Sequence, residues 1–134
     1  MFAAALHDVE TGAHTLVRDQ LVQKPLYYYA DQDFLIYASE LRALLEVDFI
    51  PWKIDSKTLP GFLASSYYAW DTTPIEGIKK LLPGHLLKYV DGKATVSRYW
   101  DSVPGQDPSS LSYDGARSQF EALFSESCRI SMRS

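Results

Sequence analysis

The chain has 134 residues, of which 46% are apolar and 22% are charged, a size and composition that suit one soluble globular domain with a single core. It carries 13 Lys and Arg against 17 Asp and Glu, a formal net charge of −4, so no basic field exists to attract nucleic acid and we expect no nucleic-acid partner. The single cysteine, Cys128, excludes an intrachain disulfide, makes a reducing intracellular compartment the default, and most simply serves as a small apolar residue of a helix.

The first third of the chain predicts two β-hairpins. Phe2–Leu6 is a short apolar run that predicts a strand buried on both faces, and residues 14–19 resume the extended pattern after a turn at Gly12. Residues 26–30 and 34–38 are rich in aromatic residues and predict the second hairpin. The apolar run at the start is too short for a signal peptide or a membrane span, so we expect a cytoplasmic protein without membrane contacts.

Two helices are expected next. Ser39 is the predicted N-cap of a helix that begins SELRALL. A second helix is expected within residues 54–67, with Asp55 or Ser56 as its cap. Pro60 is awkward inside that helix, which should therefore be short or broken.

The second half of the chain predicts an irregular stretch, one more hairpin and a final helix. The segment HLLKYV-DG-KATVSRYW carries the best hairpin signal, because Asp91-Gly92 suits a type I′ turn. The segment PGQDPSS is polar and rich in turn residues, which indicates a linker, and the residues after it have apolar positions at helical spacing. About six strands and two or three helices indicate an α+β fold.

No motif of catalysis or metal binding is visible in the residues themselves. His7, His14 and His85 are isolated, and no pair of them has the spacing of metal ligands, so we expect no metal site. Phosphate-binding glycine loops and nucleophile motifs are also absent. The acidic residues that could pair by tertiary contact are better explained as caps or turn residues: Asp8, Asp19, Glu40 and Asp101.

A series of segments resembles a known family. In chain order they read MFAAALHD, LVRDQLVQKPLYY, LIYASELRALL, IDSKTLPGFL, TPIEGIKKLLPGHLLKY and RYWD. Together, from Met1 to around Asp101, they resemble the second half of the N-terminal glutaminase domain of glutamine-dependent asparagine synthases. That domain is a class II amidotransferase of the N-terminal-nucleophile type. Each segment alone is a weak signal, whereas their order and spacing make the resemblance specific.

The resemblance implies a domain organisation and a chemistry. Residues 1–103 would be the C-terminal half of a sandwich of antiparallel strands with flanking helices. Residues 104–111 would be a linker, and residues 112–134 the first helix leading toward an ATP-dependent synthetase domain. The family uses an N-terminal cysteine to hydrolyse glutamine, and ATP and Mg in the synthetase domain. Neither the cysteine nor the ATP loop lies in these residues, so we expect this chain alone to be inactive, with no cofactor of its own.

The motif RDQLVQKPLYYY departs from the family pattern at two positions, because Gln20 replaces the usual Arg and Val22 the usual Gly. We assign no catalytic residue. The remaining motif residues are expected to order the turn before the aromatic strand: Arg18, Asp19, Lys24 and Pro25.

Three functional hypotheses follow. The chain is a piece of a glutamine-dependent enzyme that transfers the amide nitrogen of glutamine to aspartate, or it is a non-catalytic pseudo-glutaminase used for scaffolding or protein contacts. In the third, Tyr67, Tyr68 and Trp70 form an exposed platform for a carbohydrate or another ligand, although burial would explain the same residues. Half a sandwich leaves strand edges and faces uncovered, so we expect self-association or a complementing glutaminase or synthetase chain as partner.

Overall fold

A computed structural model describes residues 2–21, 24–102 and 111–132. Val22 and most of the predicted linker, residues 104–110, lie outside the described residues. The chain divides into two compact units, Met1–Ser102 and Val103–Ser134, and each is described by itself. The first unit holds seven strands and two helices in its described part, and the second holds one helix.

Four antiparallel strands form the first sheet, sheet A. They are β1 (Ala3–His7), β2 (His14–Arg18), β6 (His85–Val90) and β7 (Lys93–Arg98), in the order β1-β2-β6-β7. Both predicted hairpins of this sheet are confirmed. In the turn between β6 and β7, Asp91 and Gly92 have φ values of 49° and 71°, and positive φ at both central residues is what a type I′ turn requires.

Three antiparallel strands form the second sheet, sheet B. They are β3 (Tyr27–Ala30), β4 (Leu35–Ala38) and β5 (Ile78–Lys80), in the order β4-β3-β5. The β3–β4 hairpin closes without glycine because Oδ1 of Asp31 accepts hydrogen bonds from the backbone N–H groups of Asp33 (2.9 Å) and Phe34 (2.7 Å). Strand β5 was not predicted, since its three residues carry no periodic signal.

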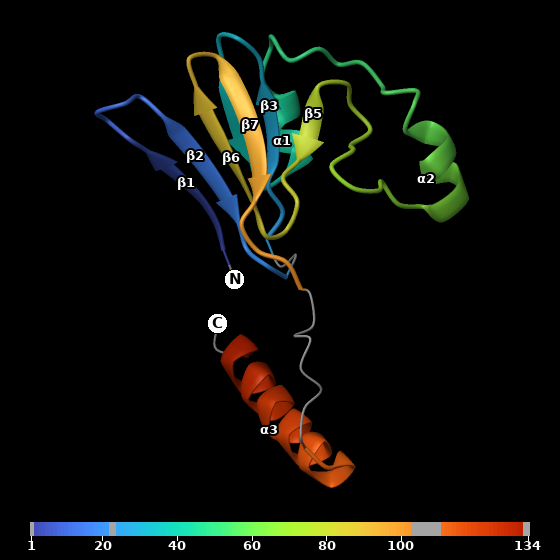
Figure 1. Cartoon of the computed structure of the whole chain (residues 1–134). Helices are drawn as coiled ribbons and strands as arrows, with labels where there is room; N and C mark the ends of the chain where they lie inside the picture. Colours follow the sequence, from blue (N-terminus) through green and yellow to red (C-terminus); the bar gives the residue numbers. More distant parts are fainter. Residues whose placement is uncertain (1, 22–23, 103–110, 133–134) are drawn as a thin grey trace. The chain divides into compact units, whose positions relative to one another are not determined.

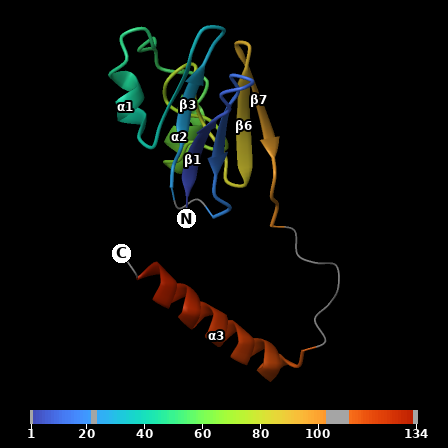
Figure 2. The same ribbon diagram turned by 90° about the vertical axis from the view of Figure 1, so that its left-hand side faces the viewer.

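The core has two parts, one on each face of sheet B. The part between the two sheets is built from Leu16, Leu26, Tyr28, Leu81 and Leu87. The other part is built from Leu44, Ile50, Ile75 and Ile78, and includes α1 (Leu41–Leu45). Figure 1 shows the two sheets, and Figure 2 shows α1 on one side of β3 and β6 on the other. Sheet B is therefore covered on both faces.

Strand β1 is exposed, which contradicts the prediction that it is buried on both faces. It lies at the edge of sheet A, where β2 is its one partner among the described strands, and Leu6 is 58% exposed. An apolar run alone cannot distinguish a central strand from an edge strand whose outer face lacks a covering layer in the described residues.

The predicted helices are present, but two of their predicted caps are wrong. The N-cap of α1 is Glu40 rather than Ser39, and the N-cap of α2 (Leu59–Ser65) is Thr58 rather than Asp55 or Ser56. Pro60 lies in the first turn of α2, where its missing N–H costs no hydrogen bond, so the proline starts this helix and does not break it.

The helix of the second unit, α3 (Tyr113–Ser131), has Ser112 as its N-cap, whose hydroxyl accepts a hydrogen bond from the backbone N–H of Gly115 at 3.2 Å. Two antiparallel sheets with helices confirm the predicted α+β class. None of the helices in the described ranges has the length and apolar character that crossing a membrane requires.

Candidate functional site

Arg18 is a buried cation at the end of β2. Its side chain is 5% exposed. Its Nε donates to the carbonyl oxygen of Lys24 at 2.9 Å, and its Nη1 donates to the carbonyl oxygen of Leu81 at 2.6 Å. Burial lowers the pKa of the Arg18 guanidinium, and the negative charge of Asp19 acts in the opposite direction. Arg18 thus joins the motif turn to the segment between β5 and β6.

Asp19 is equally buried and joins three segments of the chain. Its Oδ2 accepts from the backbone N–H of Phe2 at 3.1 Å, and its own N–H donates to the Phe2 carbonyl at 2.9 Å. Its carbonyl accepts from the N–H of Gly84, also at 2.9 Å. Its Oδ1 is buried and has no hydrogen-bond partner within the described residues. We refer to Arg18, Asp19 and the backbone groups bonded to them as the Arg18–Asp19 cluster.

The structure brings three of the four motif residues together. Lys24 contributes its carbonyl oxygen to Arg18, while its side chain is exposed. Pro25 is exposed and precedes the buried Leu26. The assignment of these residues to turn order rather than to catalysis stays a prediction. Its physical basis is that the Nε and Nη1 donors of Arg18 are directed at backbone carbonyls.

The groups most often used in catalysis are dispersed. Cys128 is exposed on α3, in the second unit. His7 and His14 stack on each other with ring centroids 4.3 Å apart, at the exposed end of the β1–β2 hairpin. No group of three His, Cys, Asp or Glu side chains in the described ranges is arranged to hold a metal ion.

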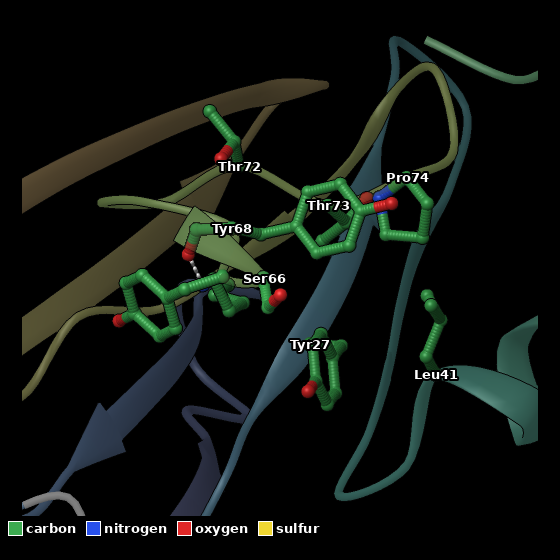
Figure 3. Close-up of a pocket in the computed structure, with 9 residues that line it drawn as sticks. Tyr27, Leu41, Ser66, Tyr68, Thr72, Thr73 and Pro74 are labelled. Atoms are coloured by element: carbon green, nitrogen blue, oxygen red, sulfur yellow. Dashed lines mark hydrogen bonds between the residues drawn. The ribbon is translucent and has the colours of Figure 1, made fainter. Parts of the chain in front are cut away.

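A pocket lies beside the segment that connects α2 to β5. It has a volume of about 330 Å³. Figure 3 shows Tyr27 and Leu41 below Ser66, Tyr68 and Pro74. The last three belong to the connecting segment, which begins at Ser66. Tyr67 and Lys80 also line the pocket, and we call this site the tyrosine pocket.

Lys80 supplies the positive charge of the tyrosine pocket. Its Nζ donates to the carbonyl oxygen of Tyr68 at 2.5 Å and lies 5.0 Å from the centroid of the Tyr67 ring. Burial lowers the pKa of the Lys80 ammonium, the positive charge of Arg18 lowers it further, and Asp71 acts against both. No signal in the sequence separates Lys80 from its neighbour Lys79, because only strand register shows which of the two faces the pocket.

The aromatic residues around the pocket are not simply core residues. Tyr67 is 63% exposed and Trp70 is 78% exposed, while the ring of Tyr68 is half-buried and stacks on Phe62 at 4.6 Å. Burial therefore does not account for Tyr67 and Trp70. The sequence pattern that could identify this site was the run of aromatic residues between two turn segments.

Comparisons with known proteins identify the family of this sequence. The sequence model of the glutamine amidotransferase domain matches residues 1–100. The chain is also similar to "Asparagine synthetase [glutamine-hydrolyzing] 3" of Bacillus subtilis (strain 168), with 28% identity over 102 residues. That match covers 75% of this chain and 17% of the relative, so the chain corresponds to a small part of that protein's length. The chain belongs to the glutamine amidotransferase domain family, and its domain is of the asparagine synthase type.

Proposed function

We propose that the chain is part of a glutamine-hydrolysing enzyme that transfers the amide nitrogen of glutamine to aspartate at the expense of ATP, and so makes asparagine. The observation that carries this proposal is the family match over residues 1–100 together with the similarity to the Bacillus subtilis asparagine synthetase. In such an enzyme the ATP and Mg would bind in a synthetase domain, and the helix α3 would lead toward it. The first unit would be the C-terminal half of the glutaminase domain.

In this proposal the described residues of the first unit supply framework rather than reacting groups. The two sheets enclose an apolar core, and the Arg18–Asp19 cluster ties β2, the motif turn and the β5–β6 segment together. The single cysteine of the sequence lies on α3. We therefore expect these 134 residues alone not to hydrolyse glutamine.

The activity of the isolated chain is tested by incubating it with glutamine and measuring ammonia. We expect no release above the buffer blank, for either the unchanged chain or the matched variant Cys128→Ser. Release that depends on Cys128 would overturn the expectation, because it would place a working nucleophile on α3.

The wider assignment is tested by the DNA on either side of the coding sequence. An upstream frame with an N-terminal cysteine and a downstream frame with an S-G-G-x-D-S loop are expected. An intact short gene with neither neighbour would instead support the non-catalytic scaffold, in which the same sheets serve only protein contacts.

We also propose that the exposed parts of sheet A are covered by a second copy or by a complementing glutaminase or synthetase chain. The support is the outer edge of β1, which pairs with no other strand of the described residues, and the 58% exposure of Leu6 on it. Sedimentation of the isolated chain checks this, since a strictly monomeric species across a wide concentration range would contradict self-association.

A further inference from the structure

The tyrosine pocket has the size and walls of a small-molecule site. Its volume of about 330 Å³ lies at the lower end of the range for ligand pockets. Tyr27 and Tyr68 offer aromatic walls, and Ser66 adds a hydroxyl. All of these residues belong to the first unit, and the family assignment gives none of them a role. A ligand that fits should be small and partly planar.

The charge at the pocket is unbalanced. Lys79 forms an ion pair with Asp71 at 3.2 Å, whereas Lys80 has no carboxylate within ion-pair distance in the described part of the chain. The Tyr68 carbonyl takes one of the three N–H donors of the Lys80 ammonium. Asp71, the negative charge that acts on Lys80, is already paired with Lys79, so a half-buried ammonium without an ion-pair partner in the described residues and near the buried Arg18 favours a bound anion.

Two residues at or beside the pocket have a left-handed backbone conformation. Ser66, which lines the pocket and is the C-cap of α2, and Trp70, which lies two residues beyond the lining residue Tyr68, both have φ of 54°, in a region that residues other than glycine rarely adopt. Such strain persists only where surrounding contacts impose it, and it is enriched at ligand sites. Tyr68, which lies between Ser66 and Trp70 in the sequence, stacks on Phe62, and this contact fixes the ring that faces the pocket.

We propose that the tyrosine pocket binds a small organic carboxylate with a planar apolar body. The carboxylate accepts hydrogen bonds from the Lys80 ammonium, and the planar body lies against the rings of Tyr27 and Tyr68. The exposed ring of Tyr67 lies over the ammonium and shields the ion pair from water. The proposal goes beyond glutamine hydrolysis, because it does not depend on which enzyme the chain belongs to.

The test is a titration of the full 134-residue chain with benzoate, followed by amide chemical shifts in NMR spectra. Benzamide, which has the same shape without the charge, is the matched ligand control. For a ligand of this size we expect a dissociation constant on the order of 1 mM, with saturable shifts at Tyr27, Tyr68 and Lys80. Benzamide should bind about tenfold more weakly or not at all.

Two lysine variants separate this site from general charge effects. Lys80→Met keeps the apolar stem and should weaken benzoate binding about tenfold or more, while Lys88→Met, at an exposed lysine outside the pocket lining, should leave it unchanged. Equal losses in both variants would overturn the proposal, as would benzamide binding as tightly as benzoate. If Lys80→Met does not fold, the benzoate and benzamide comparison on the unchanged chain still decides the question. An absence of saturable shifts, or tighter binding of a neutral sugar such as glucose, would also overturn it.

Discussion

A tyrosine and a basic residue occur both between the two sheets and around the segment after α2, but the two regions differ in how far these side chains are buried and paired. Between the sheets, Tyr28 and Arg18 are 7% and 5% exposed, and Arg18 donates to two backbone carbonyls. After α2, Tyr67 is 63% exposed, and Lys80 has a carbonyl partner but no paired carboxylate in the described residues. A ring or a cation thus stabilises the fold in one region and is available to a ligand in the other. Burial and hydrogen-bond partners separate the two roles, whereas residue type does not.

The largest effect is expected from removing the buried cation. Arg18→Ala leaves the carbonyl oxygens of Lys24 and Leu81 without their donor and Asp19 without its neighbouring positive charge. We expect the free energy of unfolding to fall by about 3 kcal/mol, measured by urea denaturation.

The control for this change is Arg98→Ala. Arg98 forms an ion pair with Asp101 at 2.7 Å, but its side chain is 57% exposed. Solvent screens such a pair, so the loss should be about 0.5 kcal/mol or less. Similar losses in the two variants would show that the Arg18–Asp19 cluster has no special role in stability.

A second effect concerns alkaline pH. Burial between the sheets, with a smaller contribution from Asp71, raises the pKa of Tyr28 from 10.0 to about 12. The unfolded chain therefore loses this proton first, and stability falls as the pH rises from about 10 to about 12, by roughly 2–3 kcal/mol in all. Below pH 10 the group is neutral in both states, and its contribution does not change.

Tyr28→Phe should remove this part of the alkaline loss. The check is urea denaturation at a series of pH values from 9 to 12, in which the slope of the unchanged chain should exceed that of the variant. Parallel slopes would mean that Tyr28 reaches water in the folded protein.

A smaller effect is expected from a tyrosine hydroxyl that reaches the Arg18–Asp19 cluster from the residue after β7. The Tyr99 hydroxyl donates to the carbonyl oxygen of Arg18 at 2.7 Å. Tyr99→Phe should lower the free energy of unfolding by about 1 kcal/mol, the usual net value of one such bond. Tyr113→Phe, at a position 83% exposed on α3, is the control and should change stability little, so a difference near zero between the two variants would contradict the prediction.

The sequence predicted what local chemistry determines and missed what tertiary pairing determines. The β6–β7 hairpin follows from Asp91-Gly92 alone, and Pro60 correctly marks a short helix, although its caps were misplaced. The exposure of β1 could not be predicted, because it depends on which strand lies beside it.

In the candidate sites, too, the sequence indicates individual residues but not their tertiary partners. The motif indicated Arg18, but its acceptor on Leu81 lies 63 residues away in the sequence. The tyrosine pocket needs the register that pairs Tyr27 with Lys80, and no run of neighbouring residues encodes that pairing.

The smallest expected effect separates strain from binding at the wall of the tyrosine pocket. Ser66 is the C-cap of α2 at φ 54°, where glycine is preferred, so Ser66→Gly should raise the free energy of unfolding by about 0.5–1 kcal/mol. Ser65→Gly should lower it by a similar amount, because Ser65 is helical and its hydroxyl donates to the carbonyl oxygen of Gly61. Thermal or urea unfolding of the pair measures both signs. If the strain at Ser66 holds the pocket in shape, Ser66→Gly should also weaken benzoate binding. A variant that is more stable and binds equally well would show that the strain belongs to the helix end and not to the site.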